Sequence, residues 1–425
     1  MAYDTLNLWI TRVSIMKTPF LAGLFVALSF LLALPAQAQF GLFKSALVKG
    51  DEAYEREDFD AAFSHYTRAA KKDDAEAHFK LGRMYERGEG TEANPASALT
   101  WYTKAAEAGM AMAQTNLGVL YDTGRGTEEN NVAAARWFRE AARQGNSVAQ
   151  YNLALMLHHG DGIPQNKAQA AALYGRAADQ GLPLAFLPRA DLLSELGRYD
   201  QAFTSYLRAE NAGSVEAAFR RGVLLRKGLG VDADPAAALA QYRKAADAGF
   251  PLAQQQLGVM TTLGEPTLGL VSDPETGIAL LERAGEQGFA PALMELAYLY
   301  DSEISINDQI VVERDLELAL SYLVKAAQVG NALAQNAAGE RILMGVGVTA
   351  DPIGALDFFI AAARQNYPNA FFNLGQMHQT GIGLEKNLEE AAKLYAKALE
   401  LGVEDARQPL VDVCADNAFP ACFLR

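Results

Sequence analysis

The stretch Met110–Gly145, MAMAQTNLGVLYDTGRGTEENNVAAARWFREAARQG, decides the fold of this 425-residue chain. In its first half, Ala113, Leu117 and Leu120 lie at positions i, i+4 and i+7, the spacing of one face of a helix. Gly124 is expected to end that helix, because glycine readily takes the left-handed conformation found just after a helix C-terminus. The Gly-x-Gly sequence that begins there predicts a tight loop.

The second half of the stretch predicts a second helix. Asn130 is a suitable N-cap residue, and Gly145 marks the end of the helix. A lone helical hairpin of this length cannot bury its apolar stripe, so the hairpin must stack against copies of itself. The stripe consists of Ala134, Trp137, Phe138, Ala141 and Ala142.

Copies of this unit recur along the chain. The residue that ends each unit returns mostly at intervals of 36 residues. Two neighbouring intervals are longer, with 39 residues from Gly249 to Gly288 and 42 from Gly288 to Gly330. A repeat of this period predicts a helical array in which each unit touches only its neighbours. The end positions are Gly109, Gly145, Gly181, Gly213, Gly249, Gly288, Gly330, Asn366 and Gly402.

The recurring phrases are LGRMYERGEG from Leu81, LGVLYDTGRG from Leu117, LALMLHHGDG from Leu153 and LGQMHQTGIG from Leu374. They resemble the SEL-one-like repeat (SLR) family, a relative of the tetratricopeptide (TPR) repeats with a longer loop between the helices. The resemblance covers roughly residues 46–402. It implies an all-α, right-handed superhelical solenoid of tandem helical hairpins.

Two units lack the Gly-x-Gly loop and look like tetratricopeptide units. One is a capping unit at 45–74, with GDEAYEREDFDAAFSHYTRAA from Gly50, and the other is the unit at 182–213, with LGRYDQAF from Leu196. We therefore expect SLR units over 75–402 and a capping segment at 403–425. In the SLR units, Gly118 and Gly258 follow packed leucines and are expected where the paired helices touch.

The N-terminus reads as a cleaved signal peptide over residues 1–38. Lys17 precedes an apolar run at 20–34, and Ala36-Gln37-Ala38 supplies the small residues of a cleavage site. The run is shorter than the ~20 residues of a membrane-spanning helix, so no integral membrane protein is expected. Met16 is the natural start that this arrangement suggests. The expected location is periplasmic or secreted.

The charge balance argues against nucleic acid as a partner. The whole chain has a net charge of −14, with 37 basic and 51 acidic residues. Removal of residues 1–38 takes away Arg12, Lys17 and Asp4, which leaves 35 basic and 50 acidic residues and a net charge of −15. Such an excess of acid repels the phosphate backbone, and it biases any groove toward basic partners.

No catalytic, cofactor-binding or metal-binding motif stands out. His158-His159 before Asp161 suggests a metal site, but neighbouring residues at a helix end are expected to point in different directions. The stretch DSEISINDQIVVERD at 301–315 alternates oxygen donors like a calcium loop. It has Ile306 where the loop needs glycine and Val312 where it needs a bidentate glutamate, so no calcium site is expected.

The longer intervals contain two insertions whose structures the sequence leaves open. One is the extra sequence around 301–314, where Ile304, Ile306, Ile310 and Val312 would form either an apolar contact patch or a longer helix with a packed turn. The other is TTLGEPTLGLVSDP from Thr261, with the same ambiguity.

Cys414 and Cys422 are expected to form a disulfide, because two cysteines exported together to an oxidising compartment usually pair. On one helix they would lie ~12 Å apart, too far for a bridge. The chain must therefore leave the capping helix between them, at Asp416-Asn417 with Pro420. Cysteine-rich relatives with a disulfide in each repeat have been described as penicillin-binding or β-lactam-hydrolysing; with two cysteines, this chain departs from that group.

The resemblance implies an exported, non-enzymatic scaffold without a cofactor that binds a protein or peptide. Its roles would lie in envelope assembly, exopolysaccharide secretion, signalling regulation or contact with host proteins. The alternatives are a cell-wall or β-lactam hydrolase and a passive assembly part. The expected binding surface is an inner wall built from the first helix of each unit, with polar and mostly uncharged side chains. The candidate wall positions are Arg83, Asn116, Asn152, Gln256 and Gln376.

Overall fold

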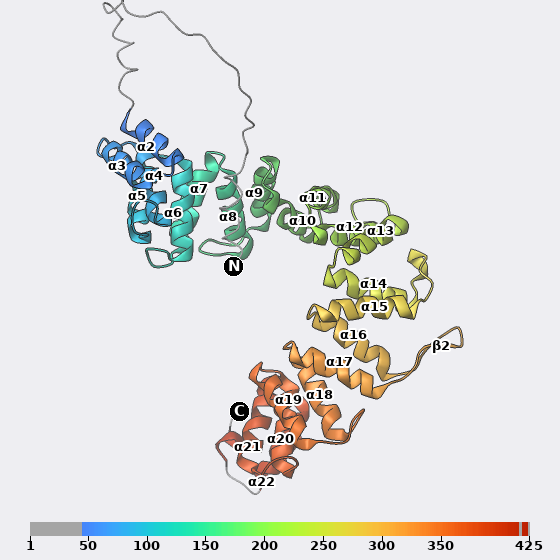
Figure 1. The fold of residues 1–425 in the computed structure, drawn as a ribbon. Helices are drawn as coiled ribbons and strands as arrows, with labels where there is room; N and C mark the ends of the chain where they lie inside the picture. The colour runs from blue at the N-terminus through green and yellow to red at the C-terminus, as the bar shows by residue number, and fades with distance from the viewer. Residues whose placement is uncertain (1–44, 416–418, 424–425) are drawn as a thin grey trace, which may run out of the picture. The chain divides into compact units, whose positions relative to one another are not determined.

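The computed structural model describes residues 45–415 and 419–423 of the chain (Figure 1). It divides between Ala93 and Asn94 into two compact units. The predicted signal peptide and the start at Met16 lie outside the described residues. So does Asp416-Asn417, where the chain was predicted to leave the capping helix.

The described part is built of tandem helical hairpins, so the predicted all-α solenoid is confirmed apart from one small β-hairpin. The first unit contains α2 (Ala46–Glu55), α3 (Phe59–Ala70) and α4 (Ala75–Arg87). The second unit begins with α5 (Pro95–Glu107), α6 (Ala111–Thr123), α7 (Asn131–Arg143), α8 (Ser147–His159), α9 (Lys167–Asp179), η1 (Pro183–Ala185), α10 (Phe186–Glu195), α11 (Tyr199–Asn211), α12 (Val215–Lys227) and α13 (Pro235–Asp247). It continues with α14 (Pro251–Leu263), η2 (Pro266–Leu268), α15 (Pro274–Glu286), α16 (Ala290–Asp301), β1 (Ile304–Ile306), β2 (Gln309–Val312), α17 (Leu316–Gln328), α18 (Ala332–Met344), α19 (Pro352–Arg364), α20 (Pro368–Thr380), α21 (Leu388–Glu400), η3 (Glu404–Ala406), α22 (Arg407–Ala415) and η4 (Pro420–Phe423).

The predicted stop and start signals of the repeat are confirmed in α6 and α7. Gly124 takes the left-handed conformation after α6, with φ 63°. The Asn130 side chain caps α7, where its Oδ1 accepts a hydrogen bond from the Ala133 backbone N–H at 2.9 Å. Asn366, which replaces the terminal glycine of one unit, is also left-handed, with φ 58°; asparagine tolerates this conformation better than most residues. Local sequence thus defines each hairpin.

Within the second compact unit, neighbouring hairpins are joined by packing and by a repeated polar contact. From α6 to α21, each second helix packs on its own first helix and on the first helix that follows, and α5 packs on α6. In four of these junctions a buried glutamine near the start of the first helix donates through Nε2 to a backbone carbonyl of the preceding second helix. The glutamine at the end of the same hairpin's second helix then donates to its Oε1 at 2.8 Å. The buried glutamines are Gln114, Gln150, Gln254 and Gln335.

The glycines predicted at helix contacts lie there. A Cβ added at Gly118 would lie 2.6 Å from the ring of Phe138, and one added at Gly258 would lie 2.9 Å from the Gly277 carbonyl oxygen. Both distances are too short for a real side chain, so at these two positions glycine fits the neighbouring helix as it is placed. Ala154, Ala190 and Ala297 hold the same position in other hairpins.

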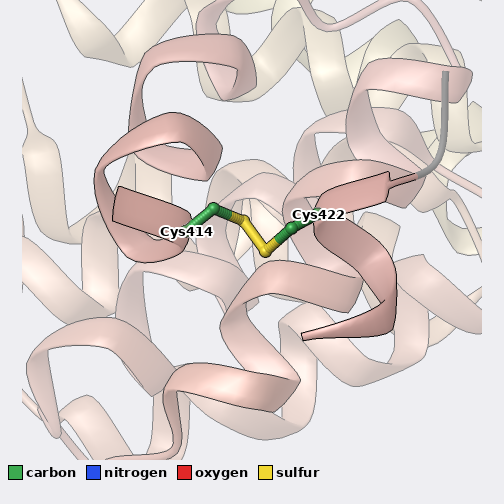
Figure 2. The surroundings of a disulfide bond; sticks show 2 residues. All are labelled: Cys414 and Cys422. Carbon is green, nitrogen blue, oxygen red and sulfur yellow. A yellow bond between two sulfur atoms is a disulfide. The ribbon is translucent and has the colours of Figure 1, made fainter. Parts of the chain in front are cut away.

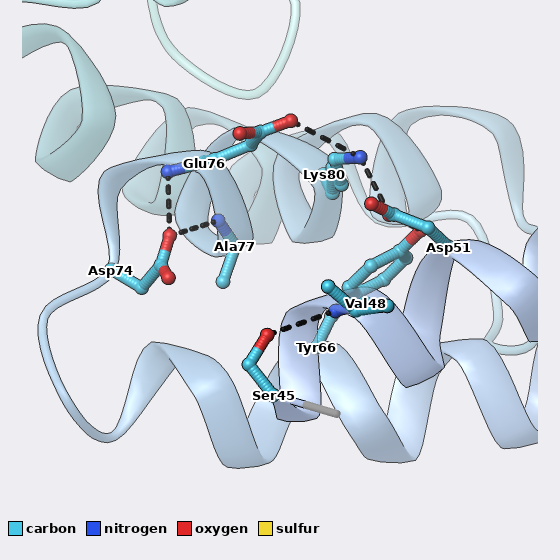
Figure 3. A network of polar contacts seen from close by, with 8 residues as sticks. All are labelled: Ser45, Val48, Asp51, Tyr66, Asp74, Glu76, Ala77 and Lys80. Carbon is cyan, nitrogen blue, oxygen red and sulfur yellow. Dashed lines mark hydrogen bonds and ion pairs between the residues drawn. The ribbon is translucent and has the colours of Figure 1, made fainter. Parts of the chain in front are cut away.

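The two short-looped hairpins, at 45–74 and 182–213, each contain a hydrogen bond from a tyrosine of the second helix to an aspartate of the first helix. In the first unit, the Tyr66 hydroxyl donates to Asp51 at 2.8 Å, and Lys80 of the following helix donates to the same carboxylate at 2.6 Å (Figure 3). In the second unit, the Tyr206 hydroxyl donates to Asp191 at 2.7 Å. The connections are short in both units, from Arg56 to Asp58 and from Leu196 to Arg198.

The insertion at 301–314 is a β-hairpin and not a longer helix. α16 ends at Asp301, and β1 pairs with β2 in antiparallel register, with Ile306 opposite Gln309. The turn residues Asn307 and Asp308 both have positive φ, as a tight hairpin turn requires. The expected common patch of Ile304, Ile306, Ile310 and Val312 needs correction, because Val312 is 4% exposed and belongs to the core, whereas Ile310 is 53% exposed.

The C-terminal segment is closed by a disulfide between Cys414 and Cys422, whose Cα atoms lie 5.8 Å apart (Figure 2). Cys414 lies on α22 and Cys422 on η4. Val413 and Ala421 beside them are buried in a cluster that also contains Tyr395 of α21, and burial raises the pKa of Tyr395 to about 12. Closing a loop of 8 residues contributes ~2.5 kcal/mol on the chain-entropy model, which holds the cap onto the last hairpin.

Candidate protein-binding surface

The predicted wall positions occupy two rows on the first helices. One row is the residue before the position that Leu117 holds in its unit, and the other is the second residue after that position. The two rows are three residues apart, so they lie side by side on one face of each helix. We call these two rows the first-helix face. In residues 94–423 they are occupied by Asn116 and Val119, Asn152 and Leu155, Pro188 and Asp191, Arg220 and Val223, Gln256 and Val259, Glu295 and Tyr298, Ala337 and Glu340, and Asn373 and Gln376.

The description of this wall as polar and mostly uncharged needs correction. Val119, Leu155, Val223 and Val259 make half of the second row apolar in the second unit. Tyr298 adds an aromatic ring that is 69% exposed. The five predicted positions share polarity, and the apolar members of the second row do not. The regular spacing of these apolar residues was the signal in the sequence that could have revealed them.

Four of the predicted residues have side-chain amides that form no hydrogen bond within the described residues. Asn116, Asn152 and Gln256 are half-buried, and their side chains form no hydrogen bond within the described residues. Gln376 is exposed. An amide carries both a donor and an acceptor, so each of these side chains can bond to a peptide group of another chain.

Arg83 belongs to the first unit and is already engaged. Its guanidinium lies over the Tyr54 ring, 4.9 Å from the centroid. The Tyr54 hydroxyl donates to Glu89 at 2.6 Å, so the aromatic ring is itself fixed. Arg83 therefore has a packing role in its own unit.

Other members of the first-helix face are bonded to the neighbouring unit. The Asn373 side chain donates to Asn336 at 3.0 Å and to Glu340 at 2.9 Å. Gln255, next to Gln256, donates to Glu295 at 3.3 Å. Side chains on this face thus bond to the neighbouring hairpin at some positions and can bond to a partner at others.

The short-looped unit at 182–213 places a carboxyl group on the same face. Burial raises the pKa of Asp191 above its usual range, against the lowering effects of the hydrogen bond from Tyr206 and of the positive charge of Arg220. Glu216 and Glu195 also raise it. The face therefore has an acidic position with charged neighbours between the amides of Asn152 and Gln256.

The His158-His159 pair differs from the expectation. The two rings stack with centroids 4.6 Å apart and an interplanar angle of 13°, so they do not point apart. Rotation about the side-chain bonds brings the rings together although the Cα–Cβ bonds diverge. Burial, and then the neighbouring His159, lower the pKa of His158. Within residues 45–415 and 419–423, no group of three or more His, Cys, Asp or Glu side chains is arranged to hold a metal ion. No helix in that part of the chain has the length and hydropathy of a membrane span.

Comparison with known proteins identifies the repeat. The Sel1 repeat family model matches nine segments that cover most of the chain and leaves 183–214 unmatched. Sel1 repeat proteins generally mediate interactions between proteins, and their scaffold is typically non-enzymatic. The matched segments are 36–74, 75–110, 111–146, 147–182, 215–250, 251–289, 290–331, 332–367 and 368–403.

Two solved structures are similar over most of the chain. One is c5321, a protective antigen of uropathogenic Escherichia coli strains with an SLR fold; it is 27% identical, with a TM-score of 0.61, and the match covers 90% of this chain and 82% of that one. The other is a Sel1 repeat protein from Oxalobacter formigenes, 28% identical with a TM-score of 0.59, covering 74% and 89%.

A curated relative is the chitin synthase regulator SKT5 of Saccharomyces cerevisiae, 27% identical over 246 residues. That match covers 49% of this chain and 35% of the relative, so the chain spans about a third of the length of this protein. The family matches and the helical hairpins agree in position along the chain. This chain therefore belongs to the Sel1 repeat family.

Proposed function

We propose that this protein is an exported, non-enzymatic scaffold that binds a polypeptide partner on its first-helix face. The observation that carries the proposal is the set of unpaired amides at Asn116, Asn152 and Gln256, each three residues before an apolar side chain. Amides fix the peptide groups of an extended chain, and the apolar row contacts its side chains. We propose further that the scaffold acts in envelope assembly, exopolysaccharide secretion or signalling regulation.

The test is a triple substitution, Asn116→Ala, Asn152→Ala and Gln256→Ala. A partner is first identified by crosslinking in intact cells and mass spectrometry, and its binding to purified protein is then measured. We expect at least a tenfold loss of affinity, because each lost hydrogen bond contributes ~0.5–1.5 kcal/mol. Helical content and melting temperature should not change, since none of the three amides forms a hydrogen bond within residues 45–415 and 419–423.

A matched control uses polar residues on the second helices. Gln169, Asn211 and Gln328 are exposed on α9, α11 and α17, and their joint replacement by alanine should leave the affinity unchanged. Equal losses in the two triple variants would show that the first-helix face has no special part in binding.

Export is the second part of the proposal, and it predicts the state of the mature protein. Cleavage after Ala38 gives an N-terminus at Gln39, and an oxidising compartment keeps Cys414 and Cys422 paired. N-terminal sequencing of protein from the cell envelope or medium should therefore begin at Gln39, and thiol counting without reductant should find no reactive thiol. A full-length cytosolic product with two free thiols would refute export.

A further inference from the structure

The two insertions of the second unit meet and form one groove. The lengthened loops belong to consecutive units, 251–289 and 290–331, and both lie between the first and second helices of their unit. Because consecutive units stack in order, the loop after α14 and the β-hairpin after α16 come side by side (Figure 1). They enclose a groove of about 480 Å³, with apolar lining from Leu263, Leu270, Val271, Pro274, Ile306 and Val311.

The groove occupies a place at which hairpins with a regular Gly-x-Gly loop make a tight contact. In those units, the second glycine of the Gly-x-Gly loop lies against the first residues of the preceding second helix. A Cβ at Gly126 would lie 2.4 Å from the Pro95 backbone, and one at Gly347 would lie 2.1 Å from the Leu316 carbonyl oxygen. The unit at 290–331 has the β-hairpin in place of that loop, and Pro274 at the start of α15 lines the groove.

Two features of the lining are suited to an extended chain. Each strand of the β-hairpin pairs only with the other within the described residues, so each has an unpaired outer edge. The register shift between Ile304 and Ser305 leaves Val311 outside the strand pairing, and Val311 lines the groove. Val271 is 85% exposed on the opposite loop. A free strand edge beside apolar side chains is the arrangement that binds peptides by strand addition.

The negative charge around the groove favours an occupant with positively charged side chains. Six carboxylates and one guanidinium, that of Arg314, lie in the segments 263–275 and 302–314, which contain the lining residues. Glu265 is already paired with Arg226 of α12 at 2.8 Å, which leaves five carboxylates against one guanidinium. The start of α15 does not offset this charge, because the Asp273 side chain caps it and proline occupies its first position. Opposite charges across an interface speed association and select the partner. The six acidic residues are Glu265, Asp273, Glu275, Glu303, Asp308 and Glu313.

We propose that this groove binds an extended polypeptide segment that combines apolar side chains with lysine or arginine. The inference rests on the proposed scaffold function and places a second contact away from the amides of the first-helix face. The occupant is a segment of another protein, bound along the β-hairpin with its apolar side chains between the two insertions and its basic side chains at the acidic rim.

The test uses a phage-displayed library of random peptides selected on the purified full protein. Enriched peptides should contain at least two apolar residues and one or more Lys or Arg. The double variant Val271→Ser and Ile306→Ser should bind them at least tenfold more weakly. Val132→Ser with Ile353→Ser is the matched control, since these side chains are 66% and 70% exposed on second helices, and it should bind normally. Affinity should also fall as salt is raised, because the rim attraction is screened.

Three results would overturn the inference: no enriched peptide that depends on Val271 and Ile306, enrichment of acidic peptides, or a change of light-scattering mass in the groove variant, which would indicate a second copy as the occupant. Peptide binding should persist in the triple variant at Asn116, Asn152 and Gln256. If that variant still captures the crosslinked partner and no groove peptide exists, both proposals fail. If only the groove fails, the scaffold function remains.

Discussion

Replacement of Gly118 by alanine is expected to destabilise the protein by about 1–3 kcal/mol, the usual cost of overfilling a packed contact. The new methyl group would lie 2.6 Å from Cε1 of Phe138, which is 1% exposed and has no room to retreat. The ring would have to move into its neighbours or the two helices would have to separate. Leucine at the same position should cost more. Thermal and denaturant unfolding of purified variants measure the effect.

Gly175 provides the matched control for Gly118. It is also a buried helical glycine, but a Cβ there would meet only the end of the Arg189 side chain, at 3.2 Å. A flexible guanidinium can shift, and alanine favours a helix over glycine by roughly 0.5–1 kcal/mol. Gly175→Ala should therefore be neutral or stabilising. If the two alanine variants unfold alike, the close approach of α6 and α7 does not limit stability.

The hairpins could be predicted from the sequence because their signals are local. Gly124 and Asn130 act within a few residues of their own position, and Gly118 is adjacent to the leucine that it accompanies. The close helix contact at Gly118 followed from the repeated spacing alone, since the same small residue recurs after the same apolar one. Signals of this kind need no knowledge of distant parts of the chain.

The β-hairpin was missed although its signal was present. Asn307-Asp308 stands between runs of isoleucine and valine, and asparagine and aspartate tolerate the positive φ of a two-residue turn. In the comparison with a calcium loop, Asp301, Glu303 and Asn307 are oxygen ligands, so Asn307 was not recognised as a turn residue. The groove was missed for another reason: the two long intervals are neighbours in the sequence, but this adjacency was not used to predict that their insertions meet.

The apolar members of the first-helix face show what polarity alone cannot predict. Val119, Leu155 and Val259 have ordinary core-like identities, and only the relation of their row to the neighbouring unit shows that they lie beside unpaired amides. The exposed Tyr298 is in the same row. Which residues of a repeat pack and which remain accessible depends on the neighbouring unit, so it follows from the stacking and not from one hairpin.

Replacement of Gln254 by leucine is expected to destabilise the protein by about 1–3 kcal/mol, the cost of a buried polar group left without a partner. Gln254 is 1% exposed, and its Nε2 donates to the Ala246 carbonyl oxygen at 3.0 Å while its Oε1 accepts from Gln287 at 2.8 Å. Leucine keeps most of the volume but bonds to neither group. Urea unfolding measures the loss of stability.

The matched control is Gln287→Ala, which removes only the outer link of the same contact. Gln287 is exposed, so water replaces its bonds, and the expected change is within about 0.5 kcal/mol. The carbonyl of Ala246 keeps its partner in this variant. A loss for Gln287→Ala as large as that for Gln254→Leu would show that the outer link contributes as much as the buried one. No loss for Gln254→Leu would mean that packing alone joins the hairpins.

The chain itself offers a comparison, since Ala218 holds the corresponding position of α12, where the junction forms without the glutamine. That junction has instead the pair of Arg221 with the buried Glu210, so a polar contact joins the helices there by another route.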